Sequence, residues 1–172
     1  MSKTILITGS STGIGAAAAL RLAPGNRIIV HYHTSRDAAE ATAAGVRQRG
    51  GTALVAQADV STEAGCRALA AFAAKQCGKL DALVNNAGGV IRRQNAREYE
   101  WDLIARVFAL NTFSAMFLSS QCIPLLEQGE DPSIVNVTSI AIRHGAPTAT
   151  VYGAAKGALD VFTRCLLYTS DA

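Results

Sequence analysis

Residues 4–15 read TILITGSSTGIG, and this stretch decides the fold. An apolar, β-branched run typical of a buried strand passes directly into a glycine-rich turn and then into an alanine-rich helical segment. Gly9 permits a tight turn out of the strand, Gly13 lets the backbone approach a ligand closely, and Gly15 lets the helix pack on the sheet. Because the start of a helix offers free N–H groups, the pattern predicts a pyrophosphate site. A glycine-rich turn without a ligand is the alternative.

The rest of the chain alternates short apolar runs with longer helical stretches. The predicted strands are Thr4–Thr8, Arg27–His31, Ala53–Ala56, Leu80–Asn85 and Ser133–Thr138. The predicted helices are Ile14–Leu22, Asp37–Gln48, Thr62–Gln76, a long one near Tyr99–Leu126, and a last one that begins near Val151. This alternation predicts an α/β fold: a Rossmann-like, doubly wound parallel sheet with the strand order 3-2-1-4-5.

Composition limits the function classes. The 172 residues are 49% hydrophobic and 17% charged, which is typical of one globular domain and excludes intrinsic disorder. The net charge of +3 comes without any run of Lys or Arg, so no nucleic acid or membrane partner is expected. Val107–Leu126 carries no charge over about the length of a membrane span, but its polar side chains favour a helix buried against protein.

The cysteines and the N-terminus bear on metal binding and location. None of the four cysteines has CxxC spacing or a histidine nearby, so no metal site is expected. The chain enters an apolar strand at once, without the pattern of a secretion signal. We therefore expect reduced thiols and a cytoplasmic location.

Tyr152 and Lys156 are four residues apart in the last predicted helix, so their side chains share one face of it. A neighbouring ammonium group favours the deprotonated phenol, which makes the phenol a better proton donor and acceptor near neutral pH. The pattern predicts that Tyr152 exchanges a proton with a carbonyl or alcohol oxygen, and that Ser139, after the fifth strand, hydrogen-bonds that oxygen. A solvent-facing pair and a turn-capping serine are the alternatives.

Five motifs in order resemble the short-chain dehydrogenase/reductase family over residues 4 to about 164. They are the GxxxGxG spacing of Gly9–Gly15, the Asp59-Val60 pair after the third strand, the NNAG sequence of Asn85–Gly88, Asn111 within a helix, and Ser139 upstream of the Tyr152-xxx-Lys156 pair. Relatives similar to 3-oxoacyl reductases and to sugar dehydrogenases fit this pattern. The resemblance implies an NAD(P)-dependent oxidoreductase that interconverts a carbonyl and a secondary alcohol of a small molecule by hydride transfer.

The resemblance also assigns roles. It implies that Tyr152 is the general acid/base and that Lys156 holds the nicotinamide ribose. It also implies that Asn111 anchors a water in a proton relay and that Ser139 belongs to the same catalytic set. It implies a homodimer or homotetramer. The implied cofactor contacts are Gly9, Ser11, Thr12, Gly13, Ile14, Gly15, Asp59, Val60, Asn86, Ala87, Gly88, Tyr152 and Lys156. A non-catalytic dinucleotide-binding module is the alternative; a flavodoxin-like protein is disfavoured by the ordered catalytic set.

The end of the second strand predicts which nicotinamide cofactor binds. A protein that binds NAD usually has an acidic residue there, which hydrogen-bonds the ribose 2′-hydroxyl. Here Tyr32 takes that position. His33, Ser35 and Arg36 follow and are suited to a 2′-phosphate, so NADP (NADPH) is expected over NAD. Against this, Thr12 stands where many NADP-binding members of the family have a basic residue, so NAD is the alternative.

The C-terminus departs from the family pattern. Members continue with two further strands, whereas this chain ends sixteen residues after Lys156. Residues 165–172, CLLYTSDA, resemble a translated sequencing adapter; a genuine short C-terminus is the alternative. We therefore expect residues 1–164 to be an incomplete NAD(P)-binding domain, residues 165–172 to be a non-native tail, and the chain as written to be inactive and poorly stable.

Overall fold

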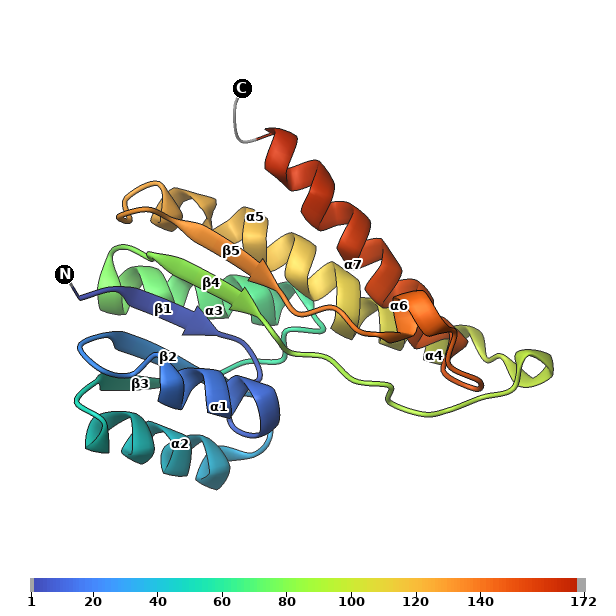
Figure 1. The fold of residues 1–172 in the computed structure, drawn as a ribbon, viewed down its shortest axis with the longest axis horizontal. Coiled ribbons are helices and arrows are strands. Elements are labelled where there is room, and N and C mark those ends of the chain that lie inside the picture. The colour runs from blue at the N-terminus through green and yellow to red at the C-terminus, as the bar shows by residue number, and fades with distance from the viewer. Residues whose placement is uncertain (1, 170–172) are drawn as a thin grey trace.

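Five parallel strands form one sheet in the order β3-β2-β1-β4-β5, which confirms the predicted topology (Figure 1). The computed structural model describes residues 2–169. The strands are β1 (Thr4–Ile7), β2 (Arg27–Tyr32), β3 (Thr52–Gln57), β4 (Ala82–Asn85) and β5 (Ser133–Asn136). The central strand β1 pairs with both β2 and β4, with Ile5 opposite Ile28 on one side and Ala82 on the other.

Helices follow each strand. They are α1 (Gly13–Arg21), α2 (Arg36–Gln48), α3 (Glu63–Cys77), the 3₁₀ turn η1 (Ala96–Glu98), α4 (Trp101–Phe108), the π-helical turn η2 (Ala109–Phe113), α5 (Ser114–Leu126), α6 (Ala141–His144) and α7 (Thr150–Thr169). The short helix α6 lies where the sequence predicts a loop, and β5 ends two residues before the predicted Thr138. Of the predicted tail, residues 165–169 continue α7 and residues 170–172 lie outside the described part of the chain.

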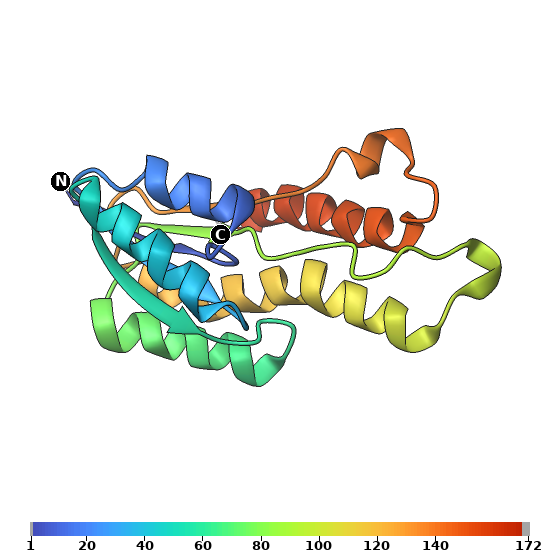
Figure 2. The ribbon, with the colours of Figure 1, turned by 90° about the horizontal axis from the view of Figure 1, so that it is seen from below.

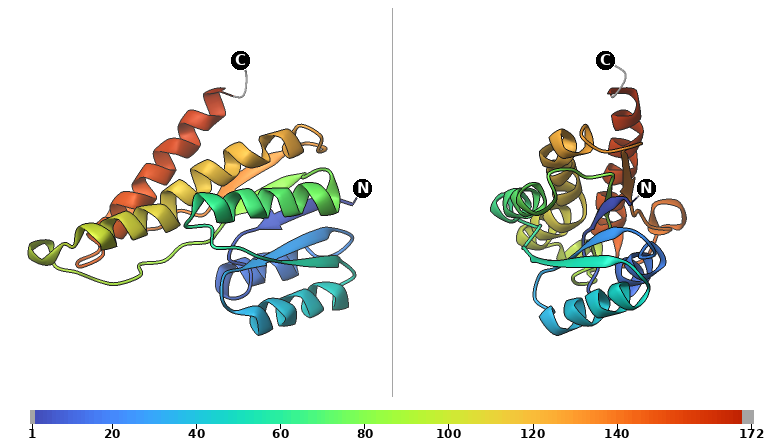
Figure 3. Two further views of the ribbon diagram at one scale, coloured as in Figure 1. Left: turned by 180° about the vertical axis from the view of Figure 1, so that it is seen from behind. Right: turned by 90° about the vertical axis from the view of Figure 1, so that its left-hand side faces the viewer.

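Two apolar layers cover the sheet because successive strand residues point to opposite faces. Along β1, Leu6 packs with α3 and α5, whereas Ile5 and Ile7 pack with α1 and α2. Figure 2 shows α1 and α7 on one side of the sheet and α3 and α5 on the other. Seen from behind, α3 and α5 run side by side across the sheet, and the C-terminal end of α7 diverges from them (Figure 3).

The predicted long helix runs from Trp101 to Leu126, but it contains a π-helical turn that the sequence pattern does not reveal. Asn111 lies in this turn, and its side-chain Nδ2 donates to the carbonyl oxygen of Val107 at 2.8 Å. A side chain that competes for a helix carbonyl disturbs the regular ladder of backbone hydrogen bonds, which accounts for the turn. By length and composition alone the helix could cross a membrane: an 18-residue window of it has a mean hydropathy of 1.4, and 44% of that window is buried inside the protein.

Candidate active site

A cavity of about 460 Å³ lies at the carboxyl ends of the strands. Every strand contributes the residues that follow it, and α7 adds two more. The sheet order reverses between β1 and β4, which is the usual place for a ligand in an open α/β sheet. The lining residues are Gly9, Ser11, Thr12, Gly13, Ile14, His31, His33, Thr34, Ser35, Asp59, Val60, Asn86, Ala87, Gly88, Leu110, Val137, Thr138, Tyr152 and Lys156.

The glycine-rich turn has the geometry that its sequence predicts. Gly9 and Gly13 adopt φ values of +62° and +58°, in the left-handed region that favours glycine. A Cβ on Gly13 would meet no protein atom within 4 Å, and Gly13 itself lines the cavity. A Cβ on Gly15 would lie 2.5 Å from Asn86 Nδ2, so Gly15 is needed for packing and does not itself line the cavity. The turn therefore leaves room for a ligand group against its backbone.

The segment after β4 is hydrogen-bonded to this turn. Asn86 Nδ2 donates to the carbonyl oxygens of Thr8 and Gly9, at 2.8 and 3.1 Å. The Thr8 hydroxyl in turn accepts the N–H groups of Asn86 and Ala87, both at 2.9 Å. Asn85 instead points away from the cavity, where its Nδ2 donates to Ser119 and Asn136. Asn86 thus has a structural role as well as a place in the cavity wall.

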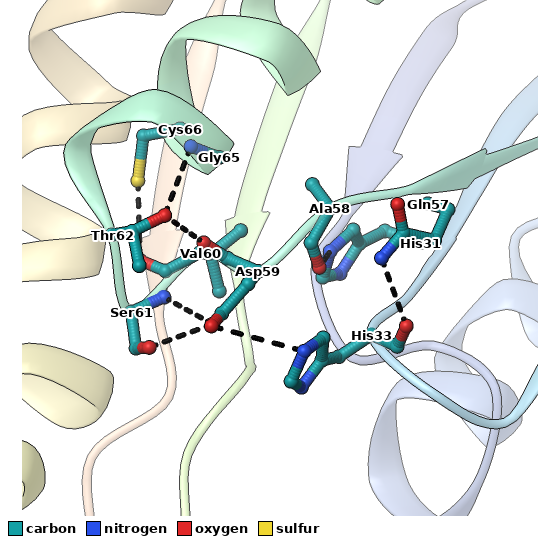
Figure 4. A network of polar contacts seen from close by, with 10 residues as sticks. All are labelled: His31, His33, Gln57, Ala58, Asp59, Val60, Ser61, Thr62, Gly65 and Cys66. Carbon is teal, nitrogen blue, oxygen red and sulfur yellow. Dashed lines mark hydrogen bonds and ion pairs between the residues drawn. The ribbon is translucent and has the colours of Figure 1, made fainter.

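The far end of the cavity is built by the segments that follow β2 and β3 (Figure 4). His33 Nε2 lies 3.8 Å from Asp59 Oδ2. The Ser61 hydroxyl donates to Asp59 Oδ1 at 2.6 Å, and this hydrogen bond is the largest effect that lowers the pKa of Asp59 below its usual range. Tyr32, by contrast, packs against the apolar layer formed with α1 and α2, and does not line the cavity. The exposed Thr34 and Ser35 line it beside His33.

Tyr152 and Lys156 both reach the cavity from α7. Lys156 is buried, with 2% of its surface exposed, and its Nζ donates to the carbonyl oxygen of Val137 at 2.7 Å. Burial lowers the pKa of Lys156 to about 8. An ammonium group has three donors, and the other two have no protein partner among the described residues. A phenol and a buried ammonium group therefore face the same space as the glycine turn.

Asn111 and Ser139 do not line the cavity. Asn111 hydrogen-bonds the backbone of Gly89, through Oδ1 and Nδ2, both at 2.9 Å. The Ser139 hydroxyl accepts the N–H of Ala141 at 3.2 Å, which is the bond of a turn-capping serine. Its neighbour Thr138 does line the cavity. The predicted contact Arg36 also lies outside the lining, as an exposed first residue of α2.

His31 is a lining residue that was not predicted. It is buried at the end of β2, and its ring accepts the Gly9 N–H through Nδ1 at 2.9 Å. The signal in the sequence is a polar residue within an apolar strand, because a buried polar group needs a hydrogen-bond partner. Leu110, Val137 and Thr138 were also missed, since they reach the cavity only through tertiary packing, and so was Thr34, which lies between the predicted His33 and Ser35.

The remaining reactive groups lie apart from the cavity. Burial raises the pKa of the Cys66 thiol to about 11 and that of Cys122 to about 12, which makes both poor nucleophiles near neutral pH. Within residues 2–169, no three His, Cys, Asp or Glu side chains gather in a way that would hold a metal ion.

Comparison with known proteins bears on this arrangement. The chain matches the family model described as short chain dehydrogenase over residues 3–169. It is 36% identical over 165 residues to an uncharacterized oxidoreductase of Methylorubrum extorquens, which covers 95% of this chain and 65% of that protein. The chain spans less than two thirds of the length of the first curated relatives that it matches.

Solved structures agree with the fold over nearly the whole chain. The NADH-dependent reductase A1-R′, responsible for alginate metabolism, superposes with a TM-score of 0.93 at 31% identity, over 98% of this chain and 71% of that one. The angucycline C-6 ketoreductase LanV with bound NADP superposes with a TM-score of 0.83 at 32% identity, over 95% of this chain and 67% of that one. Similar proteins thus use either NAD or NADP.

Proposed function

The chain belongs to the short-chain dehydrogenase/reductase family of NAD(P)-dependent oxidoreductases, and on that premise we propose that it interconverts a carbonyl and a secondary alcohol of a small molecule by hydride transfer. The observation that carries this proposal is the common cavity of Tyr152, Lys156 and the glycine turn. Binding at the turn and proton exchange at the phenol then take place in one continuous space.

The cavity fits a dinucleotide. The backbone of the turn is open at Gly13, and the N-terminus of α1 faces the same space, which suits a pyrophosphate. The segments after β2 and β3 supply polar side chains at the far end, where an adenosine belongs. Near α7, the buried Lys156 has donors for the hydroxyls of a ribose. A nicotinamide, when bound, supplies or accepts the hydride.

The protein's own contribution to the chemistry is proton transfer and positioning. We assign to the Tyr152 hydroxyl the donation of a proton to a carbonyl oxygen, or its removal from an alcohol. The ammonium group of Lys156 lies on the same face of α7 and lines the same cavity as the phenol. The Ser139 hydroxyl accepts the Ala141 N–H through a lone pair, so its own O–H can still donate to the substrate oxygen. Asn111 holds the segment that carries Gly88 and Gly89.

We propose NADP as the preferred cofactor. No acidic side chain follows β2 directly, and His33, Thr34 and Ser35 line the cavity where a 2′-phosphate would lie. Arg36 is not part of this wall, so the proposal rests on these three residues. The Asp59 carboxylate, 3.8 Å from His33, is partly balanced by that ring whenever the ring is protonated.

We also propose that the protein is a homodimer or homotetramer. Trp101, Phe113, Met116 and Ile123 are large apolar side chains exposed along one long helix. Exposed apolar side chains concentrated on one element mark a protein interface more often than a free surface. A second copy of the chain would cover them.

A turnover assay with a matched variant tests the proposed function. Small ketones, diones and hydroxyketones are offered with NADPH, and consumption of NADPH is followed. Tyr152→Phe keeps the ring but deletes the proton donor, so turnover should fall by about 10²-fold while the Kd for NADPH changes little. A Tyr152→Phe variant that keeps most of its activity would refute the role of the phenol. Binding of NADPH without turnover of any substrate would favour a non-catalytic dinucleotide-binding module.

A further inference from the structure

His31 is a polar residue at the end of an apolar strand, with 1% of its surface exposed. Its neighbours along β2, Ile29 and Val30, are completely buried apolar side chains. A buried imidazole is costly unless its two nitrogens have hydrogen-bond partners. The partners of His31 therefore show what the residue does.

Both ring nitrogens are bonded to backbone groups of other loops. Nδ1 accepts the N–H of Gly9 at 2.9 Å. Nε2 lies 3.1 Å from the carbonyl oxygen of Ala58, which Figure 4 shows beside the ring. Since a backbone N–H only donates and a carbonyl only accepts, the ring must carry its single proton on Nε2. The neutral tautomer is thus fixed by its surroundings.

The backbone of His31 is joined to the same turn. Its N–H donates to Ser10 Oγ at 2.9 Å, and its carbonyl oxygen accepts the Ser10 N–H at 3.0 Å. The Ser10 hydroxyl donates onward to the Ile7 carbonyl at 2.7 Å. The turn between β1 and α1 is therefore held by one residue of β2 through three hydrogen bonds.

We propose that His31 is a positioning residue for the dinucleotide site, an inference that rests on the proposed function. Its neutral ring bridges the first residue of the glycine turn and the segment that leads into Asp59. One side chain therefore sets the spacing between the pyrophosphate end and the adenosine end of the cavity. Gly9, whose φ is positive, donates its N–H to the ring, and this hydrogen bond favours one orientation of the turn.

Protonation would break this bridge. A second proton on Nδ1 would face the Gly9 N–H, and two donors cannot share a hydrogen bond. Burial lowers the pKa of His31 to about 4, so the neutral ring persists over most of the acidic range. The titratable groups around it are His33 on its own connection and Asp59 on the β3–α3 connection, while the β1–α1 turn brings only backbone and hydroxyl groups.

Binding of NADPH and of 2′,5′-ADP to purified variants tests the assignment by calorimetry. His31→Phe fills the same space without either hydrogen bond and should raise both Kd values at least about tenfold. His31→Asn presents an amide oxygen to the Gly9 N–H but does not reach the Ala58 carbonyl, so it should recover only part of the affinity. His144→Asn, at an exposed position of α6 outside the cavity, is the matched control and should bind as the wild type does.

A second measurement needs no substitution. In the ¹⁵N-labelled wild-type protein, a scalar coupling across the hydrogen bond should join the Gly9 amide nitrogen to His31 Nδ1, and Nε2 should carry the proton. Wild-type affinity in His31→Phe, or the absence of this coupling, would overturn the assignment. Failure of the wild-type protein to bind NADPH, NADH or 2′,5′-ADP, with the coupling present, would instead refute the proposed function.

Discussion

Asn111 hydrogen-bonds both backbone polar groups of Gly89: its Oδ1 accepts the Gly89 N–H and its Nδ2 donates to the Gly89 carbonyl, each at 2.9 Å. The second hydrogen of Nδ2 goes to Val107, so both amide donors are engaged. A side chain of the π-helical turn thus fixes the segment that leaves β4. That segment also carries Gly88, which lies against Lys156.

The first prediction concerns this contact. A Cβ on Gly88 would lie 2.6 Å from Asn111 Oδ1 and 3.0 Å from Lys156 Nζ. Gly88→Ala should therefore displace Asn111 and crowd Lys156, lower turnover at least about tenfold, and cost about 1–3 kcal/mol of unfolding free energy, as overpacking does. Gly89→Ala is the matched control, because a Cβ there meets no atom within 4 Å. Equal turnover and equal urea midpoints for the two variants would contradict the prediction.

The second prediction concerns the buried ammonium group of Lys156. Its pKa is about 8 in the folded protein and about 10.5 in the unfolded chain, which therefore binds more protons between these values. The unfolding free energy of the wild type should rise with pH through this window. Lys156→Met lacks this dependence and should also lose turnover. Urea unfolding at pH 7, 8, 9 and 10 measures the difference, and parallel pH profiles for the two proteins would show that burial of this charge carries no cost.

The third prediction concerns the cofactor. The wild-type protein should bind NADPH more tightly than NADH. Ser35→Asp places a carboxylate in the cavity wall. It should weaken the binding of NADPH at least about tenfold, or about 1.4 kcal/mol, through repulsion of the 2′-phosphate. Ser35→Asn has the same shape without the charge and is the control; the Ser35 hydroxyl makes no capping bond that either change would remove. A wild-type preference for NADH of tenfold would reject the choice of NADP.

The sequence predicts those parts of the site that depend on local pattern. The turn from Gly9 to Gly15 is recognisable because its positive φ values and close packing require glycine at fixed spacing. Tyr152 and Lys156 share a face because helical geometry places residues four apart together. These features need no knowledge of the tertiary structure.

The sequence pattern does not predict features that depend on contacts between residues far apart in the chain. The π-helical turn at Asn111 is stabilised by Gly89, which lies 22 residues earlier. The ring of His31 bonds to loops on either side of its strand. Arg36 was predicted as a cofactor contact from its place after β2, but the start of α2 turns it to solvent. Spacing along the chain does not encode such directions.

The fourth prediction concerns Asp81, which is buried at the opposite end of the sheet from the cavity. Its carboxylate accepts the N–H groups of Thr4 at 2.6 Å and Glu130 at 2.7 Å, and pairs with Lys79 Nζ at 3.1 Å. Burial acts to raise the pKa of Asp81, but these donors outweigh it, so the pKa lies below its usual value. Asp81→Asn turns an amide donor toward these donors and should cost about 1.5–3 kcal/mol at pH 7.

The pH dependence of that effect has a definite sign. Because the pKa of Asp81 is lower in the folded state, the stabilisation is complete above its unfolded value and is lost as the pH falls through the folded one. The difference in unfolding free energy between the wild type and Asp81→Asn should therefore become smaller as the pH falls below about 4. Asp160→Asn, which removes an exposed i,i+4 pair with Arg164, should change stability by less than about 0.5 kcal/mol.

The last prediction concerns assembly through the helix from Trp101 to Leu126. If a second copy covers its exposed apolar side chains, the wild-type protein should be a dimer or tetramer by light scattering at micromolar concentration. Met116→Lys places a charge among these exposed apolar side chains. It should shift the protein towards monomer, because an unpaired charge in an apolar interface is costly. Leu22→Lys is the matched control: Leu22 is exposed to a similar extent, 38% against 41%, but lies at the end of α1. Equal masses for the two variants, or a monomeric wild type, would show that this face is not the interface.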